Sequence, residues 1–268
     1  MLSLLRADFF RMWKSKSTLI GLIVCAVFPL VINLLYLGIA FFIAAFYKDE
    51  GIDPQMFGMV INARSIIGTI FASGSNVGLI IPMFAAIFIC TDMTSGMLRN
   101  KIISGKPRKH IFFSYLICSA AINLMYILLY ASLMVGFSLL FFNYSSGDID
   151  ASTEVVNILY YIISGIVAFL FLSTVALFFS LATGNSALSI VFTILFSYVL
   201  GTVNALLPLI PGDDAIYFVS LVPCYTASLN SDGVKSTVSF VEGLVSMIGF
   251  GAVNACLAYN IFIRKELK

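Results

Sequence analysis

Long apolar runs, separated by short polar or charged stretches, make up most of this chain. Several of these runs reach the roughly 20 residues that an α-helix needs to cross the ~30 Å hydrocarbon core of a bilayer. They are apolar on every helical face and rich in phenylalanine, which is typical of helices whose outer surface meets lipid. The pattern predicts six membrane spans, at residues 18–47, 76–91, 111–142, 155–182, 187–207 and 236–263.

Composition supports the same class of protein. The chain has 268 residues, of which 60% are hydrophobic and only 10% are charged. A soluble domain carries roughly 25% charged residues. We therefore expect an all-α polytopic membrane protein in which residues 1–268 form a single transmembrane domain. The first apolar run is too long for a cleavable signal peptide and lacks a small-residue cleavage site.

The N-terminal segment, residues 1–17, is predicted to be an amphipathic helix that lies on the membrane surface. Its apolar side chains share one face at 100° per residue, namely Leu2, Leu5, Phe9, Met12 and Trp13. Asp8, Arg11 and Lys14 point the other way. Tryptophan and basic side chains favour the headgroup layer, so we assign Arg6, Arg11, Trp13 and Lys14 to this interface. A simple positively charged tail before the first span is the alternative.

Two segments are too polar to be simple spans. Arg64 would lie near the middle of a span between residues 56 and 73, at a cost of roughly 2.5–3.5 kcal/mol. We therefore expect an amphipathic helix over 54–72, within a loop at 48–75. Residues 208–235 contain three prolines and three aspartates, and we expect a re-entrant helical hairpin there, because irregular backbone at membrane depth must be buried in protein.

Charge is distributed very unequally between the two sides of this topology. Six spans place both termini on one side, together with the central loop at 92–110. That side carries twelve of the fifteen basic residues, while most of the acidic residues lie opposite. The positive-inside rule makes the basic side cytoplasmic. We expect a multi-pass protein of the plasma membrane, in a bacterial cell.

No enzyme signature survives inspection, so we expect no catalytic residue and no metal site. The one histidine, His110, lies in the cytoplasmic loop, and the five cysteines have no metal or redox spacing. Ser104-Gly105-Lys106-Pro107 contains Gly-Lys but lacks the rest of a phosphate-binding loop. The chain is therefore not expected to hydrolyse ATP alone. Gly212-Asp213 lacks the first glycine and the partner aspartate of an intramembrane aspartyl protease.

Polar residues inside the spans offer a candidate pathway. Asn33 lies in the first span, and Thr193, Ser197 and Asn204 follow helical spacing in the fifth. They could line a route through the protein. Hydrogen bonds between packed helices explain the same pattern and are the more common cause.

The central loop carries the most specific motif in the chain. Asp92 at the end of the second span is followed by Gly96-Met97-Leu98-Arg99-Asn100 and then by the turn at 104–108. This loop resembles the cytoplasmic loop of ABC-2 type permeases, the type V exporters, in which an acidic residue precedes Gly-Thr-Leu-Arg-Asn. Here Met97 replaces the usual threonine and aspartate replaces the commoner glutamate. The six spans, the interfacial helix and the hairpin extend the resemblance over the whole topology.

The resemblance implies a permease subunit that pairs with a second permease copy and binds two ABC ATPase subunits, which hold the ATP and magnesium. The central loop would then form a coupling helix seated on the ATPase. The residues assigned to this contact are Asp92, Leu98, Arg99, Asn100, Lys101, Ile102 and Arg108.

The residue types in the loop are compatible with this role. Asp92, Thr94 or Ser95 could cap the start of a helix. Leu98 and Ile102 lie four apart and would present one apolar edge to the partner. The alternative is that the cations only anchor the loop at anionic lipid.

The loop motif and the spans both bear on the cargo. Compact permeases with this loop resemble exporters of antimicrobial or amphipathic peptides, or the related immunity proteins. Apolar spans favour a hydrophobic or amphipathic cargo, and we expect no nucleic acid partner. Two other classes stay open: a secondary transporter that runs without ATP, and a membrane scaffold or sensor subunit without a pathway of its own.

Overall fold

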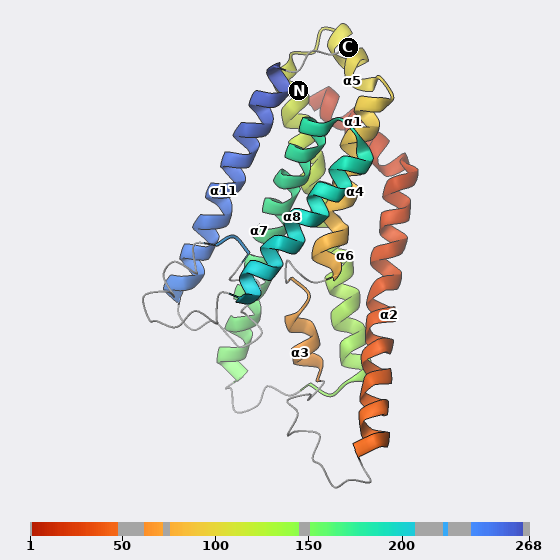
Figure 1. Ribbon diagram of the computed structural model, residues 1–268, viewed down its shortest axis with the longest axis vertical. Coiled ribbons are helices and arrows are strands. Elements are labelled where there is room, and N and C mark those ends of the chain that lie inside the picture. Colours follow the sequence, from red (N-terminus) through yellow and green to blue (C-terminus); the bar gives the residue numbers. More distant parts are fainter. Residues whose placement is uncertain are drawn as a thin grey trace.

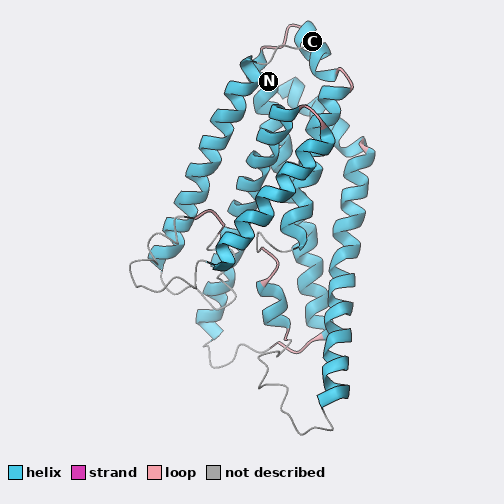
Figure 2. Cartoon of the chain, viewed as in Figure 1, coloured by secondary structure: helices cyan, strands magenta, loops and turns pink. Residues whose placement is uncertain are grey.

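The structure is a computed structural model that describes residues 2–47, 62–71, 76–144, 151–206, 222–224 and 237–264. Within these ranges the regular structure is entirely helical (Figure 2). The helices are α1 (Leu2–Lys14), α2 (Lys16–Tyr47), α3 (Ala63–Gly68), α4 (Asn76–Thr94), α5 (Met97–Ile103), α6 (Arg108–Phe141), α7 (Ala151–Thr183), α8 (Ser186–Leu206) and α11 (Thr237–Arg264).

Five of these helices, α2, α6, α7, α8 and α11, are long and apolar enough to cross a membrane. The α4–α5 pair, bent by 61°, adds a sixth crossing if it counts as one span. Helices therefore occupy the six places where the sequence pattern predicts spans. The chain is a polytopic helical membrane protein.

The long helices form an elongated bundle with α4 at its centre (Figure 1). Helix α4 packs against α2, α6, α7 and α8, while α11 packs chiefly on α7. From Ile81 to Cys90 nearly every side chain of α4 is buried, whereas α2, α8 and α11 each leave a broad apolar face exposed. A helix buried on all sides and surrounded by helices with exposed apolar faces is the arrangement expected in lipid.

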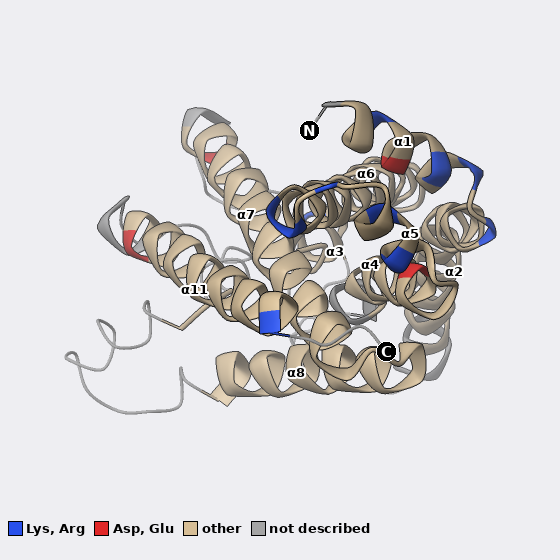
Figure 3. Ribbon diagram, turned by 90° about the horizontal axis from the view of Figure 1, so that it is seen from above, with Lys and Arg blue, Asp and Glu red and all other residues tan. Residues whose placement is uncertain are grey.

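One end of the bundle carries α1, α5 and the end of α11, and we call it the basic end (Figure 1). Seen from this end, lysines and arginines gather over α1, α5 and the start of α6 (Figure 3). Among the described residues, Arg64 is the one cation at the opposite end. The unequal charge distribution in the sequence is therefore also a separation in space.

At the opposite end, the predicted helix over 54–72 is shorter where the structure describes it. Helix α3 covers only Ala63–Gly68, and its start is stabilised by Asn62, whose side chain accepts a hydrogen bond from the Ser65 amide. Phe71, just beyond it, is buried against α7 and packs edge-on to Tyr161. The segment thus enters the bundle instead of lying flat on its surface. Residues 54–61 and most of the predicted hairpin at 208–235 lie outside the described residues.

Close packing of this segment requires a glycine on α7. A Cβ atom added at Gly165 would lie 2.2 Å from Cγ of Phe71, far inside van der Waals contact. The Tyr161 hydroxyl bonds the backbone of the same segment, donating toward the Gly68 carbonyl at 2.8 Å and accepting from the Phe71 amide at 3.0 Å. The backbone polar groups at and beyond the end of α3 therefore find a hydrogen-bond partner on α7.

Candidate functional site

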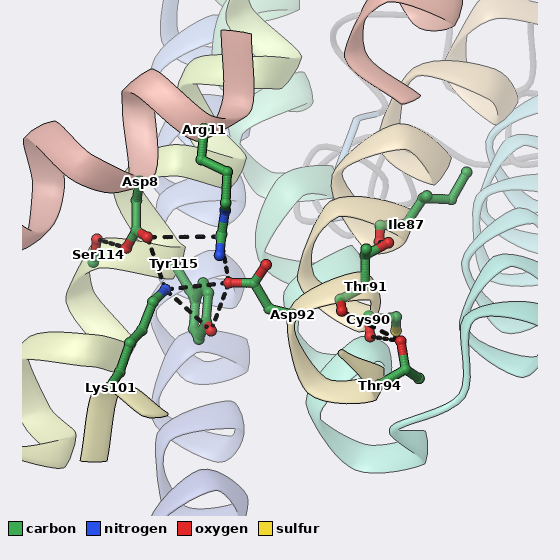
Figure 4. Close-up of polar contacts among 10 residues, drawn as sticks. All are labelled: Asp8, Arg11, Ile87, Cys90, Thr91, Asp92, Thr94, Lys101, Ser114 and Tyr115. Carbon is green, nitrogen blue, oxygen red and sulfur yellow. Dashed lines mark hydrogen bonds and ion pairs between the residues drawn. The ribbon is translucent and has the colours of Figure 1, made fainter. Parts of the chain in front are cut away.

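The basic end contains a buried cluster of four charged residues, hereafter the charge cluster: Asp8 and Arg11 from α1, Asp92 from α4 and Lys101 from α5 (Figure 4). Two residues of α6, Ser114 and Tyr115, complete its hydrogen bonds. The cluster therefore joins four helices, including both short helices of the basic end.

Asp92 is the central acceptor. Its Oδ2 atom accepts hydrogen bonds from the Arg11 guanidinium, from Lys101 Nζ at 3.1 Å and from the Tyr115 hydroxyl at 2.9 Å. Lys101 Nζ also lies 4.5 Å from the centre of the Tyr115 ring, and the Arg11 guanidinium lies over Phe88. Both cations are thus held by aromatic side chains as well as by carboxylates.

Asp8 forms the second half of the cluster. Its Oδ1 atom lies 2.8 Å from Lys101 Nζ and 3.6 Å from Arg11 Nη2. Its Oδ2 atom accepts a hydrogen bond of 2.7 Å from the Ser114 hydroxyl. Lys101 consequently bridges two carboxylates that come from different helices.

Burial makes this arrangement energetically consequential. The exposed fractions of the side chains are 3% for Asp8, 4% for Asp92, 12% for Lys101 and 24% for Arg11. Two cations balance two anions, so the cluster as a whole is neutral. Desolvating charges is costly, and removing one partner from a buried pair leaves an uncompensated charge that costs about 3–5 kcal/mol. The four charges are therefore interdependent.

The structure corrects the predicted orientation of α1. The face expected in water carries Asp8 and Arg11, and these turn into the bundle because their partners on α4 and α5 lie there. Met12, which was expected in lipid, is also buried in protein. Trp13 and Phe10 are exposed, and so are Arg6 and Lys14, as headgroup contacts require. The predicted amphipathicity is real, but two of the three residues on the charged face, Asp8 and Arg11, are internal.

The expected helix cap at the start of α5 is also wrong. Asp92 belongs to α4, which runs on to Thr94, and the Thr94 hydroxyl donates back to the Cys90 carbonyl at 3.0 Å. Gly96 is the N-cap of α5, in a left-handed conformation with φ of 72° and without a side-chain hydrogen bond. A glycine joint, not a polar cap, sets the 61° bend between α4 and α5.

The apolar edge predicted for α5 faces inward. Leu98 is 2% exposed and belongs to the core, and Ile102 packs against the same core. Lys101 turns toward the charge cluster. The exposed side of α5 instead carries Met97, Arg99, Asn100 and Ile103, with Ile103 72% exposed. Spacing of four identified a shared face correctly, and in this structure that face packs against the rest of the chain.

Arg108 has a contact of its own. Its Nη1 atom donates a 2.6 Å hydrogen bond to the Ile263 carbonyl near the end of α11. A helix that ends in a membrane leaves its last carbonyl groups without helical partners. Arg108 therefore joins the start of α6 to the end of α11, next to the charge cluster but separate from it.

The candidate pathway residues lie between helices of this one chain. Asn33 on α2 donates to the Met134 sulfur and accepts from the Ser138 hydroxyl at 3.1 Å, both on α6. Thr193, Ser197 and Asn204 are buried on one face of α8, and Asn204 donates to the Pro223 carbonyl at 3.3 Å. Asn33 therefore makes the hydrogen bonds between helices that the packing interpretation predicts. Thr193 instead donates to the Ser189 carbonyl of its own helix, and Ser197 Oγ has no hydrogen-bond partner among the described residues. A pathway role for these residues stays a prediction.

Sequence reasoning missed Asp8, Ser114 and Tyr115 as members of the site. One signal was present: Asp8 is the only acidic residue in a basic segment of seventeen residues. Its charge opposes the local excess, which is a reason to look for a cationic partner from elsewhere in the chain. The charged side chains of the cluster pair with one another across helices, so the arrangement holds α1, α4, α5 and α6 together.

Comparison of the chain with family models, with curated proteins and with solved structures found no match.

Proposed function

We propose that this chain is the membrane-spanning permease subunit of an ATP-driven exporter of the ABC-2 type. Two copies would enclose the pathway, and separate ATPase subunits would dock at the basic end. The observation that carries the proposal is the geometry of α5. This short helix projects at 61° from the central helix, exposes Arg99 and Ile103, and is bonded through Lys101 to α1 and α4.

Such a helix is suited to transmit force. A partner that contacts the exposed side of α5 would displace Lys101, and Lys101 is bonded to Asp8, Asp92 and Tyr115 on three other helices. Because the four charges are buried and interdependent, they move as one unit. A push on α5 would therefore reach α1, α4 and α6 together, and α4 contacts most of the bundle.

The charge distribution supports a cytoplasmic position for the basic end. Ten of the eleven cations among the described residues lie there, and Arg64 alone lies opposite. Lysine and arginine are retained on the cytoplasmic side during membrane insertion. ATP is available on that side, so an ATPase partner would meet α5 directly. A bacterial plasma membrane and a hydrophobic or amphipathic cargo, with peptide favoured, complete the proposal.

The test is co-purification of the chain with the ATPase encoded beside it, followed by ATP turnover in lipid nanodiscs. Arg99→Glu combined with Ile103→Glu changes only exposed side chains of α5. We expect loss of the ATPase from the complex, because the substitution removes an apolar contact and reverses a charge on the docking surface. Transport of a fluorescent amphipathic peptide should fall with it.

Lys109→Glu is the matched control. Lys109 is also an exposed cation of the central loop, but it lies in the first turn of α6, where an acidic residue is favourable. We expect this variant to retain most of the bound ATPase. An unchanged complex with the α5 variant would contradict docking at α5, and transport driven by a sodium gradient without ATP would contradict the proposed class.

A further inference from the structure

A groove of about 210 Å³ lies at the opposite end of the bundle, between α3, the end of α6 and the start of α7. Apolar side chains and aliphatic carbons form most of its wall. Its lining includes Ile67, Val135, Leu139, Ile158 and Tyr161. For scale, an apolar cavity of about 150 Å³ holds a benzene molecule. The groove is large enough for a segment of an alkyl chain.

Polarity changes along the groove. Helix α6 ends at this end of the bundle and α7 begins there, so Glu154 lies near the mouth and Tyr161 lies two turns deeper, ~10 Å along the helix axis. Val135 is likewise deeper than Leu139. Arg64, Tyr144 and Glu154 line the mouth. A polar mouth above an apolar slot has the same gradient as a membrane lipid.

The charges at the mouth are fixed as a pair. Arg64 Nε donates to Glu154 Oε1 at 2.7 Å, and Arg64 Nη2 donates to Oε2 at 3.3 Å. The Tyr144 hydroxyl donates to the same carboxylate at 2.6 Å. Burial, and to a lesser degree the hydrogen bond to Glu154, raises the pKa of Tyr144 to about 12. The tyrosine hydroxyl therefore keeps its proton and remains a donor at neutral pH. The mouth thus presents one cation beside one anion, with no net charge.

The groove opens toward the membrane. Leu139 and Ile158, which line it, are both exposed on the outside of the bundle. An alkyl chain could enter sideways from the surrounding lipid without crossing water. Lipid tails already lie in apolar surroundings, so the hydrophobic effect alone gives no preference for the groove. Selection must come from shape and from the charges at the mouth.

We propose that this groove binds one acyl chain of a zwitterionic phospholipid, with its phosphate beside Arg64 and its ammonium group beside Glu154. A headgroup carrying both charges complements both members of the pair, whereas a headgroup with net charge meets repulsion from one of them. The bound chain fills the space between α3 and α7. This site depends on the membrane setting of the helices and not on the ATP-driven function.

The test uses the full-length chain in nanodiscs and a 16-carbon lysophosphatidylethanolamine as the probe, with native mass spectrometry to count bound molecules. We expect saturable binding of one molecule per chain. Glycerophosphoethanolamine, the headgroup without the acyl chain, should not bind, and lysophosphatidylglycerol should bind about tenfold more weakly. Absence of a saturable site, or equal binding of the two lysolipids, would overturn the proposal.

Two variants locate the site. Ile158→Trp fills the groove at an exposed position and should reduce binding by about tenfold or more without lowering the unfolding temperature. Val191→Trp is the matched control on α8, where an exposed valine lines no part of the groove, and it should bind normally. Equal binding by the Ile158→Trp and Val191→Trp variants would place the lipid elsewhere.

Glu154→Gln tests the headgroup assignment separately. It removes the anion but keeps Arg64, so the mouth becomes positive. We expect the preference to reverse in favour of lysophosphatidylglycerol, which carries a net negative charge. An unchanged preference for the zwitterionic probe would show that the Arg64–Glu154 pair does not discriminate between headgroups. That result would overturn this part of the proposal.

Discussion

The two ends of the bundle use buried charge in different ways. At the basic end, the charge cluster of Asp8, Arg11, Asp92 and Lys101 joins helices α1, α4, α5 and α6. At the opposite end, one pair, Arg64 with Glu154, joins only α3 to α7. Both contain equal numbers of cations and anions. They differ in how many helices depend on each charge.

That difference has a mechanical meaning. In the charge cluster, one oxygen of Asp92 accepts from three donors, so no member can change its position alone. In the Arg64–Glu154 pair, two parallel hydrogen bonds give a strong but local contact. The cluster suits an end where movement of one element must reach several helices. The pair suits an end where one segment, α3, must be held against α7.

The largest effect is expected from Asp92→Asn. It removes one of the two negative charges that balance Arg11 and Lys101 while preserving the shape of the side chain, and should destabilise the protein by about 3–5 kcal/mol. Thermal unfolding in detergent measures this loss. Adding Lys101→Met should recover part of it, because Asp8 and Arg11 then remain as a balanced pair. An unfolding temperature equal to that of the unchanged protein would mean that the cluster is not a unit.

Exchanging the two charges of an ion pair tests how many other residues depend on each charge. Arg64→Met should destabilise the protein by about 1–3 kcal/mol, because it leaves a buried carboxylate without its cation. The double exchange Arg64→Glu with Glu154→Arg should recover much of this stability, since the pair has only two charged members. Exchange of Asp92 and Lys101 should not recover, because the new lysine would face Arg11. Equal recovery of stability after both exchanges would mean that the charge cluster depends on no more partners than the Arg64–Glu154 pair does.

Gly165→Ala tests the packing of Phe71, just beyond α3, against α7. The new Cβ would lie 2.2 Å from Phe71, and overpacking of this kind costs about 1–3 kcal/mol. Gly136→Ala in α6 meets nothing within 4 Å and is the matched control, expected to be neutral or stabilising by up to about 1 kcal/mol. Combining Gly165→Ala with Phe71→Ala should remove the clash, because alanine lacks the Cγ and Cδ atoms that the new Cβ would meet. The unfolding temperatures of the three variants show whether the contact between α7 and Phe71 requires a glycine at position 165.

The smallest effect on stability is expected from Gly96→Ala at the joint between α4 and α5. Its positive φ of 72° costs an alanine roughly 1–2 kcal/mol, and no neighbouring atom adds to that cost. Under the proposed function, ATP turnover should fall more than stability does, since the joint sets the direction of α5. Gly38→Ala in α2 is the control, with helical backbone and open space. A loss of stability without any loss of turnover would separate the joint from coupling.

The sequence predicted the helices much better than the directions of their faces. Apolar runs locate the long helices because each run must be long enough to cross the bilayer, which is a local property. The orientation of α1 is not local. A helical wheel places Asp8 and Arg11 in water, and only the approach of Asp92, 81 residues beyond Arg11, turns them inward.

The same limit applies to α5 and to Arg64. Leu98 and Ile102 were recognised as one face, but spacing does not say whether a face meets its own chain or a partner. The insertion cost of Arg64 was a reason to predict a loop segment there, but it gave no sign of the partner, Glu154, which lies 90 residues further on. Pairing between distant charges depends on how the helices assemble, and neither composition nor periodicity records it.

The charge cluster also dictates an order of assembly. The partners of α1 outside its own helix include Asp92, Lys101 and Ser114, and the Asp8–Ser114 contact spans 106 residues. At about 5–20 residues per second, a ribosome needs roughly 5–20 seconds to make that interval. During this interval Asp8 and Arg11 lack these partners and stay hydrated, while Phe10 and Trp13 hold α1 at the membrane surface. The first helix to be synthesised therefore cannot reach its final position before α4, α5 and the start of α6 have been made.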